Sequence, residues 1–371
     1  MSIRPATQTH QLLANLAFVI SSLFVQQSVL AAKPDPVLVS FATVGDSRAE
    51  PGPHLNRQDQ IWLQNTRAVT RILREIQVQQ PNALFFNGDM VMGYTTDKAT
   101  FNRQYAYWRG MVANMMETGT YVVPVPGNHE VQERSKDSAG KTQKAASLAN
   151  ENIWRENMGD LIVDTERWKN IVGKELAAFQ VDNAPAVGGP DNIQTSQSQL
   201  SFSFDFADSH FAVINTDPVG NDGHAPAHWL AEDFKQAKER GAKHYFVFGH
   251  KPAYTYFYKA DVNLDGLDIY PDNLKDFWDV VEKYQAAYFC GHQHIYHAWQ
   301  PTLATGGKAW QVTVGSGGSP FSAKANDTSK PQDRMYAWAI VKVHASGKVH
   351  LDVYGFDEHY GKTQKLKSIY F

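Results

Sequence analysis

The 371-residue sequence has little cysteine, little net charge and only one long apolar run. Because Cys290 is the single cysteine, an internal disulfide is excluded and the hydrophobic core must hold the fold alone. Cys290 ends the apolar run 286–290, which favours a buried small side chain over a reactive thiol. The net charge of −3 lacks the basic excess of nucleic-acid-binding domains, so we expect no nucleic-acid-binding patch.

The one long apolar run lies near the N-terminus, in residues 12–25. Arg4 precedes it and the small residues of segment 29–32 follow it, in the order of a secretory signal peptide of residues 1–32. An uncleaved anchor is the alternative, but a membrane-spanning helix needs roughly 20 apolar residues and this run is shorter. The pattern predicts an exported protein, periplasmic or secreted, with no membrane span after cleavage and a mature chain of residues 33–371.

Short apolar runs alternate with helical patterns along the mature chain. Strands are predicted at 37–44, 83–86, 121–125, 201–206, 210–216, 245–248 and 286–290, and helices at 59–80, 99–116, 228–240 and 273–284. The tail 309–356 predicts antiparallel strands with a hairpin turn at 345–347. Residues 131–200, polar and then helical over 152–179, are expected to form an insertion over the strand ends. These elements predict an α/β fold with two mixed β-sheets packed together and helices outside.

Five short polar motifs carry the chemical information, and each follows a predicted strand. They are Gly45-Asp46-Ser47-Arg48, Asn87-Gly88-Asp89, Gly127-Asn128-His129-Glu130, Gly249-His250 and Gly291-His292-Gln293-His294. In open α/β sheets, ligands bind at the carboxyl ends of the strands. Carboxylates, carboxamides and neutral imidazoles are metal ligands. Since a lone aspartate after a strand is usually a turn or capping residue, the prediction of a metal centre depends on the five motifs together.

The order of these motifs resembles that of the calcineurin-like metallophosphoesterase family, which includes the purple acid phosphatases. The resemblance extends from residue 37 to about residue 318. It implies a four-layer, metallo-dependent phosphatase-like domain in residues 33–371, with one or two ions of manganese, iron or zinc. The ligands that it implies are Asp46, Asp89 and His294 for a first ion and Asp89, Asn128, His250 and His292 for a second. Asp89 would therefore bridge the two ions.

The implied chemistry is the hydrolysis of a phosphate ester. Two divalent ions about 3.5–4 Å apart neutralise the charge of the phosphoryl group and activate a water molecule at neutral pH. By resemblance, His129 is a catalytic residue rather than a ligand. It would protonate the leaving oxygen or stabilise the transferring group. Glu130 is expected to orient His129.

Two positions differ from the family pattern. Arg48 occupies the place of a ligating histidine, and a guanidinium cannot bind a metal ion. The purple acid phosphatases have a tyrosine three residues after the bridging aspartate, where this sequence has Met92, and Tyr94 lies two residues further on. Ferric-tyrosinate chemistry is therefore not supported. Either two ions bind, the first through three protein ligands, or one ion binds and Arg48 acts as a catalytic residue on the phosphate. We favour two ions because every other ligand position is intact.

A weaker motif lies in residues 261–272. Its opening, 261–266, matches a calcium-binding loop, but position twelve is Asp272 rather than glutamate. A polar loop that faces the substrate is favoured, and a calcium site is the alternative.

The sequence thus predicts an exported metal-dependent phosphoesterase that hydrolyses phosphate mono- or diesters through metal-activated water. It does not separate monoesters from diesters or predict an oligomeric state. The alternative is a catalytically degenerate member of the family that binds phosphate ligands or a protein partner, which only Arg48 supports. A serine hydrolase is excluded because the sequence has no nucleophile motif.

Overall fold

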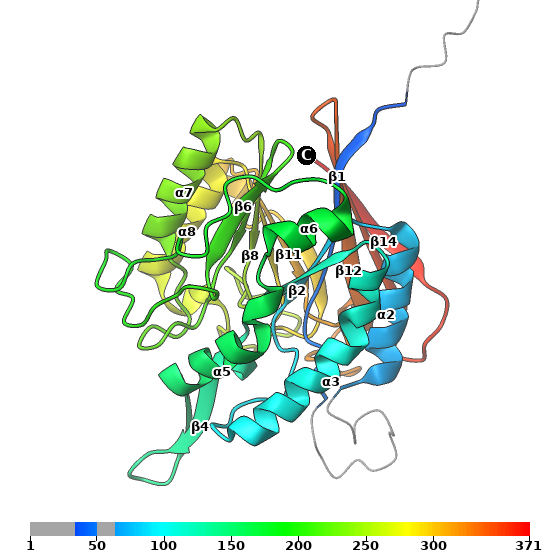
Figure 1. Cartoon of the computed structure of the whole chain (residues 1–371). Coiled ribbons are helices and arrows are strands. Elements are labelled where there is room, and N and C mark those ends of the chain that lie inside the picture. The colour runs from blue at the N-terminus through cyan, green and yellow to red at the C-terminus, as the bar shows by residue number, and fades with distance from the viewer. Residues whose placement is uncertain (1–33, 50–63) are drawn as a thin grey trace, which may run out of the picture. The chain divides into compact units, whose positions relative to one another are not determined.

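Two mixed six-stranded β-sheets lie at the centre of the computed structural model, which describes residues 34–49 and 64–371 (Figure 1). The predicted signal peptide, residues 1–32, lies outside the described residues. Residues 35–371 form one unit, so the sheets and helices below belong to a single body. No helix in the described part of the chain has the length and apolar character needed to cross a membrane.

The first sheet has the strand order β14-β13-β12-β1-β2-β3. Its strands are β1 (Val37–Val44), β2 (Ala83–Asn87), β3 (Tyr121–Val125), β12 (Met335–His344), β13 (Val349–Asp357) and β14 (Gln364–Tyr370). Strands β1, β2 and β3 are parallel, whereas β12 runs antiparallel to β1. The carboxyl ends of β1, β2 and β3 therefore meet at one edge of this sheet.

The second sheet has the order β10-β11-β9-β8-β7-β6. Its strands are β6 (Phe202–Phe206), β7 (Ser209–Val213), β8 (His244–Phe248), β9 (Ala287–Cys290), β10 (Tyr296–Trp299) and β11 (Trp310–Val314). The four inner strands are parallel, and the edge strands β6 and β10 are antiparallel to their neighbours. Strands β10 and β14 were not predicted. Strand β11 was expected to belong to an antiparallel tail, but it pairs in parallel with β9.

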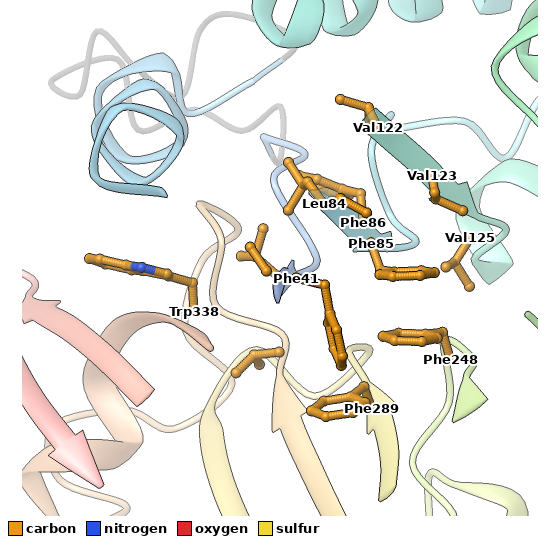
Figure 2. Close-up of a cluster of buried hydrophobic side chains, with 14 of the residues drawn as sticks. Phe41, Leu84, Phe85, Phe86, Val122, Val123, Val125, Phe248, Phe289 and Trp338 are labelled. Atoms are coloured by element: carbon orange, nitrogen blue, oxygen red, sulfur yellow. The ribbon is translucent and has the colours of Figure 1, made fainter. Parts of the chain in front are cut away.

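Phenylalanine side chains fill the space between the two sheets. Figure 2 shows Phe41 of β1 and Phe85 of β2 facing Phe248 and Phe289 of the second sheet. The rings of Phe85 and Phe248 stack with centroids 3.7 Å apart, and Phe41 lies edge-on to Phe289 at 5.7 Å. Phe41 also packs against Phe246 at 4.9 Å. Such ring pairs stabilise a core beyond the area that they bury.

Helices cover the outer faces of both sheets (Figure 1). Helices α2 (Thr66–Gln79) and α3 (Lys98–Glu117) lie on the first sheet, and α7 (Ala227–Glu239) and α8 (Pro271–Lys283) on the second. The prediction of two sheets between helical layers is confirmed. Helix α2 begins later than predicted, because the Asn65 side chain caps it by accepting from the N–H of Ala68. The predicted cap, Asp59, lies outside the described residues.

Residues 131–200 contain several short elements instead of one long helix. They are the end of α4 (Asn128–Val131), the hairpin of β4 (Gln132–Lys136) and β5 (Thr142–Ala146), α5 (Leu148–Met158) and α6 (Thr165–Val172). A short 3₁₀ helix in this segment spans Gly159–Leu161. Three others lie further along the chain, at Leu267–Ile269, Leu303–Thr305 and Pro331–Arg334. The helix predicted over 152–179 is interrupted because Asp164 caps α6 and Gly173 ends it in a left-handed conformation. Trp168 of α6 packs on Tyr121 of β3 and Phe206 of β6, so α6 covers the open side of the sandwich.

Candidate metal centre

The residues predicted to bind metal lie together at one end of the two sheets. Asp46, Asp89 and Asn128 follow β1, β2 and β3 of the first sheet. The histidines of the other two motifs follow β8 and β9 of the second sheet. Each sheet therefore provides half of the candidate centre, and all of these side chains are buried or partly buried.

Three donor atoms form the compact part of the second predicted site. Asn128 Oδ1 lies 2.8 Å from His250 Nε2 and 2.9 Å from His292 Nδ1, and the two nitrogens are 3.2 Å apart. Asp89 Oδ1 adjoins them, 3.2 Å from His250 Nε2. Ligands about 2.1 Å from one ion are themselves about 3.0–3.4 Å apart in octahedral or tetrahedral geometry. The observed spacing is close to that of ligands around a single ion.

The protons of these groups point away from the space between them. Nδ1 of His250 lies 2.8 Å from the carbonyl oxygen of Asn87, which can only accept, so Nδ1 carries the proton and Nε2 presents a lone pair. Burial lowers the pKa of His250, which keeps the ring neutral. The amide nitrogen of Asn128 donates to the hydroxyl of Tyr94, so its oxygen faces the imidazoles. The lone pairs of His250 Nε2 and Asn128 Oδ1 thus face each other, and a cation between them would remove the repulsion.

The first predicted site has a looser donor set. Asp46, Asp89 and His294 each offer one ligand atom, and the three atoms lie within 4.8 Å of one another. Nδ1 of His294 donates to the carbonyl of Pro320 at 2.6 Å, so its Nε2 lone pair faces Asp46 Oδ1 at 3.5 Å. Burial lowers the pKa of His294 to about 3, so the imidazole is neutral, which is the form that binds metals. The residues present fit an ion here as well.

Backbone geometry brings the motifs this close. Asp46, Asp89 and His292 have φ values of 61°, 52° and 67°, in the left-handed region that residues with a side chain rarely adopt. Such strained residues cluster at functional sites. A Cβ atom on Gly291 would lie 2.1 Å from Asp46 Oδ2, and one on Gly88 would lie 2.5 Å from His250 Nδ1. Glycine is therefore required at both positions because a side chain has no room.

His129 lies beside both donor sets. Its Nδ1 is 2.6 Å from the carbonyl oxygen of Met92, so this nitrogen carries a proton, and its Nε2 lies 3.6 Å from Asp89 Oδ2. Burial lowers the pKa of His129 well below its usual range in the protein without ions. The ring is thus fixed by a backbone carbonyl, with its second nitrogen toward the candidate centre.

The expected role of Glu130 as the residue that orients His129 is wrong. Its carboxylate accepts from the backbone N–H groups of Asp89, Met90, Val91 and Gly127, at 2.8–3.1 Å. Glu130 is the third residue of the four-residue helix α4, and its side chain returns to the N–H that precedes the helix, as in a capping box. It therefore joins the loops after β2 and β3, which carry the candidate ligands.

A family model for calcineurin-like phosphoesterases matches residues 53–296, about two thirds of the chain. The chain belongs to the calcineurin-like phosphoesterase family. The match includes four of the five motifs and begins after Gly45-Asp46-Ser47-Arg48. A search of curated proteins finds no match.

Solved phosphatase structures are similar to this family member in fold. The purple acid phosphatase PPD1 from yellow lupin (Lupinus luteus) seeds has a TM-score of 0.55 and 11% identity, over 91% of this chain and 54% of that chain. The structure of PhoD has a TM-score of 0.50 and 11% identity, over 91% of this chain and 73% of that chain. This chain spans about half the length of the lupin enzyme. The likeness confirms the predicted metallo-dependent phosphatase-like fold.

Arg48 differs from a surface residue in its contacts. Its side chain is largely buried, 9% of the residue is exposed, and Nε lies 3.2 Å from Asp89 Oδ2. The guanidinium therefore adds a positive charge beside the carboxylate that both donor sets share. This position of Arg48 is compatible with one bound ion or with two, because the contact of its Nε is with Asp89 and not with Asn128, His250 or His292.

Tyr94 lies in the site although the sequence spacing argued against a role. Gly93 and Tyr94 both have left-handed backbones, with φ of 50° and 54°, and the resulting turn directs the phenol inward. Its ring centroid is 3.9 Å from that of His129, and its hydroxyl accepts from Asn128. The phenol therefore fixes which end of the Asn128 amide faces the ions. Two consecutive left-handed residues after a strand-end motif are a signal only the structure reveals.

Asp265 is a further residue that sequence reasoning missed. Its Oδ1 lies 3.2 Å from Nε2 of His292, whose Nδ1 belongs to the compact donor set. A carboxylate behind a metal-binding histidine orients the ring and raises its basicity. Asp265 lies in the loop considered for calcium, where Asp268 instead accepts from Thr255 and Gly266. The cluster of acidic and histidine side chains that converges tightly in the described residues is Asp46, Asp89 and His294, and Asp265 is not part of it.

Proposed function

We propose that this family member is a metal-dependent phosphoesterase that hydrolyses phosphate mono- or diesters with activated water. The observation that carries this proposal is the cluster of potential ligand atoms on Asn128, His250 and His292, which are 2.8–3.2 Å apart. A cation between these buried atoms would stabilise them through their lone pairs. Family membership supports the same activity, because the described donor sets are the ones that the family resemblance implies.

We assign the ligands in the two sets as the sequence predicted. Asp46, Asp89 and His294 would hold the first ion, and Asp89, Asn128, His250 and His292 the second. When bound, the ions supply charge neutralisation for the phosphoryl group and make water a nucleophile near neutral pH. We favour two ions over one, since every other ligand position of the family pattern is present in the two donor sets. Manganese, iron and zinc all suit this mixed nitrogen and oxygen set.

His129 is assigned the transfer of a proton to the leaving oxygen. Met92 holds the proton of Nδ1, so Nε2 is the nitrogen that gains and releases a proton during turnover. Arg48 places its charge where it can attract the phosphoryl oxygens. Export to the periplasm or the medium is proposed from residues 1–32 alone, and N-terminal sequencing of the mature protein tests it.

Elemental analysis of the purified protein, combined with two chromogenic substrates, tests the function. We expect about two ions per chain and hydrolysis of p-nitrophenyl phosphate or bis-p-nitrophenyl phosphate, whose ratio separates monoesters from diesters. About one ion with turnover would favour the version in which Arg48 replaces the charge of the first ion. No metal and no turnover after adding manganese, iron and zinc would refute the proposal and favour a binding protein without catalysis.

Two variants separate ligation from proton transfer. Asp89→Asn should lose both ions and activity, because it removes the shared negative charge. His129→Ala should lower the rate by roughly 10²–10⁴-fold while the metal content stays unchanged. Loss of metal in His129→Ala would show that His129 is a ligand instead.

A further inference from the structure

The β4–β5 hairpin is attached to the candidate site through the backbone of Tyr94. The N–H of Tyr94 donates to the carbonyl of His129 at 3.2 Å, and the carbonyl of Tyr94 accepts from the N–H of Arg134 at 3.3 Å. Figure 1 shows the hairpin extending from the body of the molecule next to α5. Residues at the base of the hairpin are therefore held at a fixed position relative to His129.

Two cationic side chains of this hairpin lie over the ring of Tyr94. Nζ of Lys144 is 4.1 Å and Cζ of Arg134 is 5.2 Å from the ring centroid. The two residues are directly opposite each other in the register of β4 and β5. Like charges in this cross-strand position destabilise a hairpin. In the part of the chain that the structure describes, neither side chain forms an ion pair with a carboxylate.

The charge of a third cation, Arg48, also acts on Lys144. Burial, followed by the charges of Arg134 and Arg48, lowers the pKa of Lys144, and the smaller effects of the Asp89 and Asp265 carboxylates raise it. Arg134 and Lys144 are both exposed and lie opposite each other in the hairpin, so both remain available to an anion from solution. The ring of Tyr94 adds a cation–π contact, which fixes the positions of both side chains.

We propose that Arg134 and Lys144 bind a second phosphate group, carried by the leaving group of the substrate. This inference depends on the proposed function. The ions would hold the scissile phosphoryl group, His129 would face the leaving oxygen, and Tyr94 lies against His129. The cationic pair thus lies on the leaving-group side. The substrate class is a monoester of a short alcohol or phenol that carries another phosphate several ångströms from the scissile bond.

The reaction itself is an ordinary hydrolysis. The oxygen of water forms a bond to phosphorus, and the bond between phosphorus and the leaving oxygen breaks. His129 delivers one proton to the leaving oxygen and regains one from solvent, and the protons of the attacking water stay on the phosphate or pass to solvent. The cationic pair takes no part in these steps and holds the remote phosphate of the leaving alcohol.

A matched pair of substrates tests the proposal. Phenyl phosphate and hydroquinone bisphosphate share a phenolic leaving oxygen, and only the latter has a remote phosphate. In the double variant Arg134→Gln/Lys144→Gln, we expect kcat/KM for the bisphosphate to fall about 10- to 100-fold and that for phenyl phosphate to change less than about threefold. The control is Lys136→Gln/Lys141→Gln, which removes the same charge from the same hairpin and should leave both values unchanged.

Three results would overturn the proposal. Equal losses for both substrates would mean that the pair supports the hairpin or the scissile phosphate, and no loss would mean that it binds no substrate. Wild-type protein that hydrolyses neither substrate, nor the diester bis-p-nitrophenyl phosphate, with manganese, iron or zinc would refute the proposed function instead. In that case calorimetric binding of hydroquinone bisphosphate still decides the inference. At least tenfold weaker binding to the double variant supports the subsite, and equal binding overturns it.

Discussion

Replacing Tyr94 by phenylalanine tests whether the phenol orients a metal ligand. The change removes one oxygen atom and leaves the aromatic ring, which packs on His129 at 3.9 Å. The hydroxyl is the acceptor for the Asn128 amide nitrogen, and Asn128 is 4% exposed. Without this acceptor, the buried nitrogen has no partner unless the amide turns.

The cost follows from the burial of that nitrogen. An unsatisfied buried donor costs about 1–3 kcal/mol. The metal-free variant can avoid this cost by turning the amide, which also moves the Asn128 oxygen away from the lone pairs of the two histidines. The ion-bound variant cannot turn, because the oxygen is then needed as a ligand. The difference therefore appears as binding of the second ion that is weaker by about 5- to 150-fold.

Titration with manganese or zinc against a competing chelator measures this affinity. The matched control is Tyr105→Phe, which removes a phenolic oxygen that is also buried and has no hydrogen-bond partner among the described residues. We expect Tyr105→Phe to bind ions like the wild type. If Tyr94→Phe also binds both ions with unchanged affinity, Tyr94 does not orient Asn128 and the reasoning is refuted.

Three further changes give distinct expectations. Asp265→Asn removes the charge behind His292 and should weaken binding of the second ion about 10- to 100-fold, and unchanged affinity in the same titration would contradict this. Gly291→Ala should displace the Asp46 carboxylate, which lies 2.1 Å from the added Cβ, so elemental analysis should find one ion fewer than in the wild type. The third concerns pH. Burial would lower the pKa of His210, but hydrogen bonds to the carboxylates of Asp205 and Asp233 raise it. The folded state then binds this proton more tightly than the unfolded state, so the contribution to stability is complete below about pH 6.5 and is lost as the pH rises through the raised pKa. Melting temperatures should fall over this range, and values that stay constant from about pH 6 to pH 9 would refute the assignment.

Local patterns predicted most of the fold and the positions of the candidate ligands. Apolar runs followed by glycine located β1, β2, β3, β8 and β9, because a buried parallel strand is a continuous apolar run. The β4–β5 hairpin was missed because its strands, Gln132–Lys136 and Thr142–Ala146, are mainly exposed and polar and lack an apolar alternation. Such strands depend on the turn and the contact with Tyr94, which sequence periodicity does not report.

Contacts between residues could be predicted only where the chain is regular. Spacing from Asp89 showed only that Tyr94 does not occupy the tyrosine position of the purple acid phosphatases. Its place in the site depends on two left-handed residues, which spacing does not report. Glu130 was assigned to His129 because they are adjacent, although neighbours in a helical turn point in different directions. Asp265 reaches His292 from a loop that shares no motif with it.

The phenylalanine layer between the sheets has a consequence for the choice of metal. Asp46 and Asp89 follow strands of the first sheet, whereas His250 and His292 follow strands of the second. Ring packing in the interior, around Phe41, therefore contributes to the spacing between the two halves of the donor set. Ligand distances for Mg²⁺ and Ca²⁺ differ by only about 0.3–0.5 Å, less than the width of a methyl group. A substitution in this dry layer can thus change which ion is selected without altering any atom that touches it.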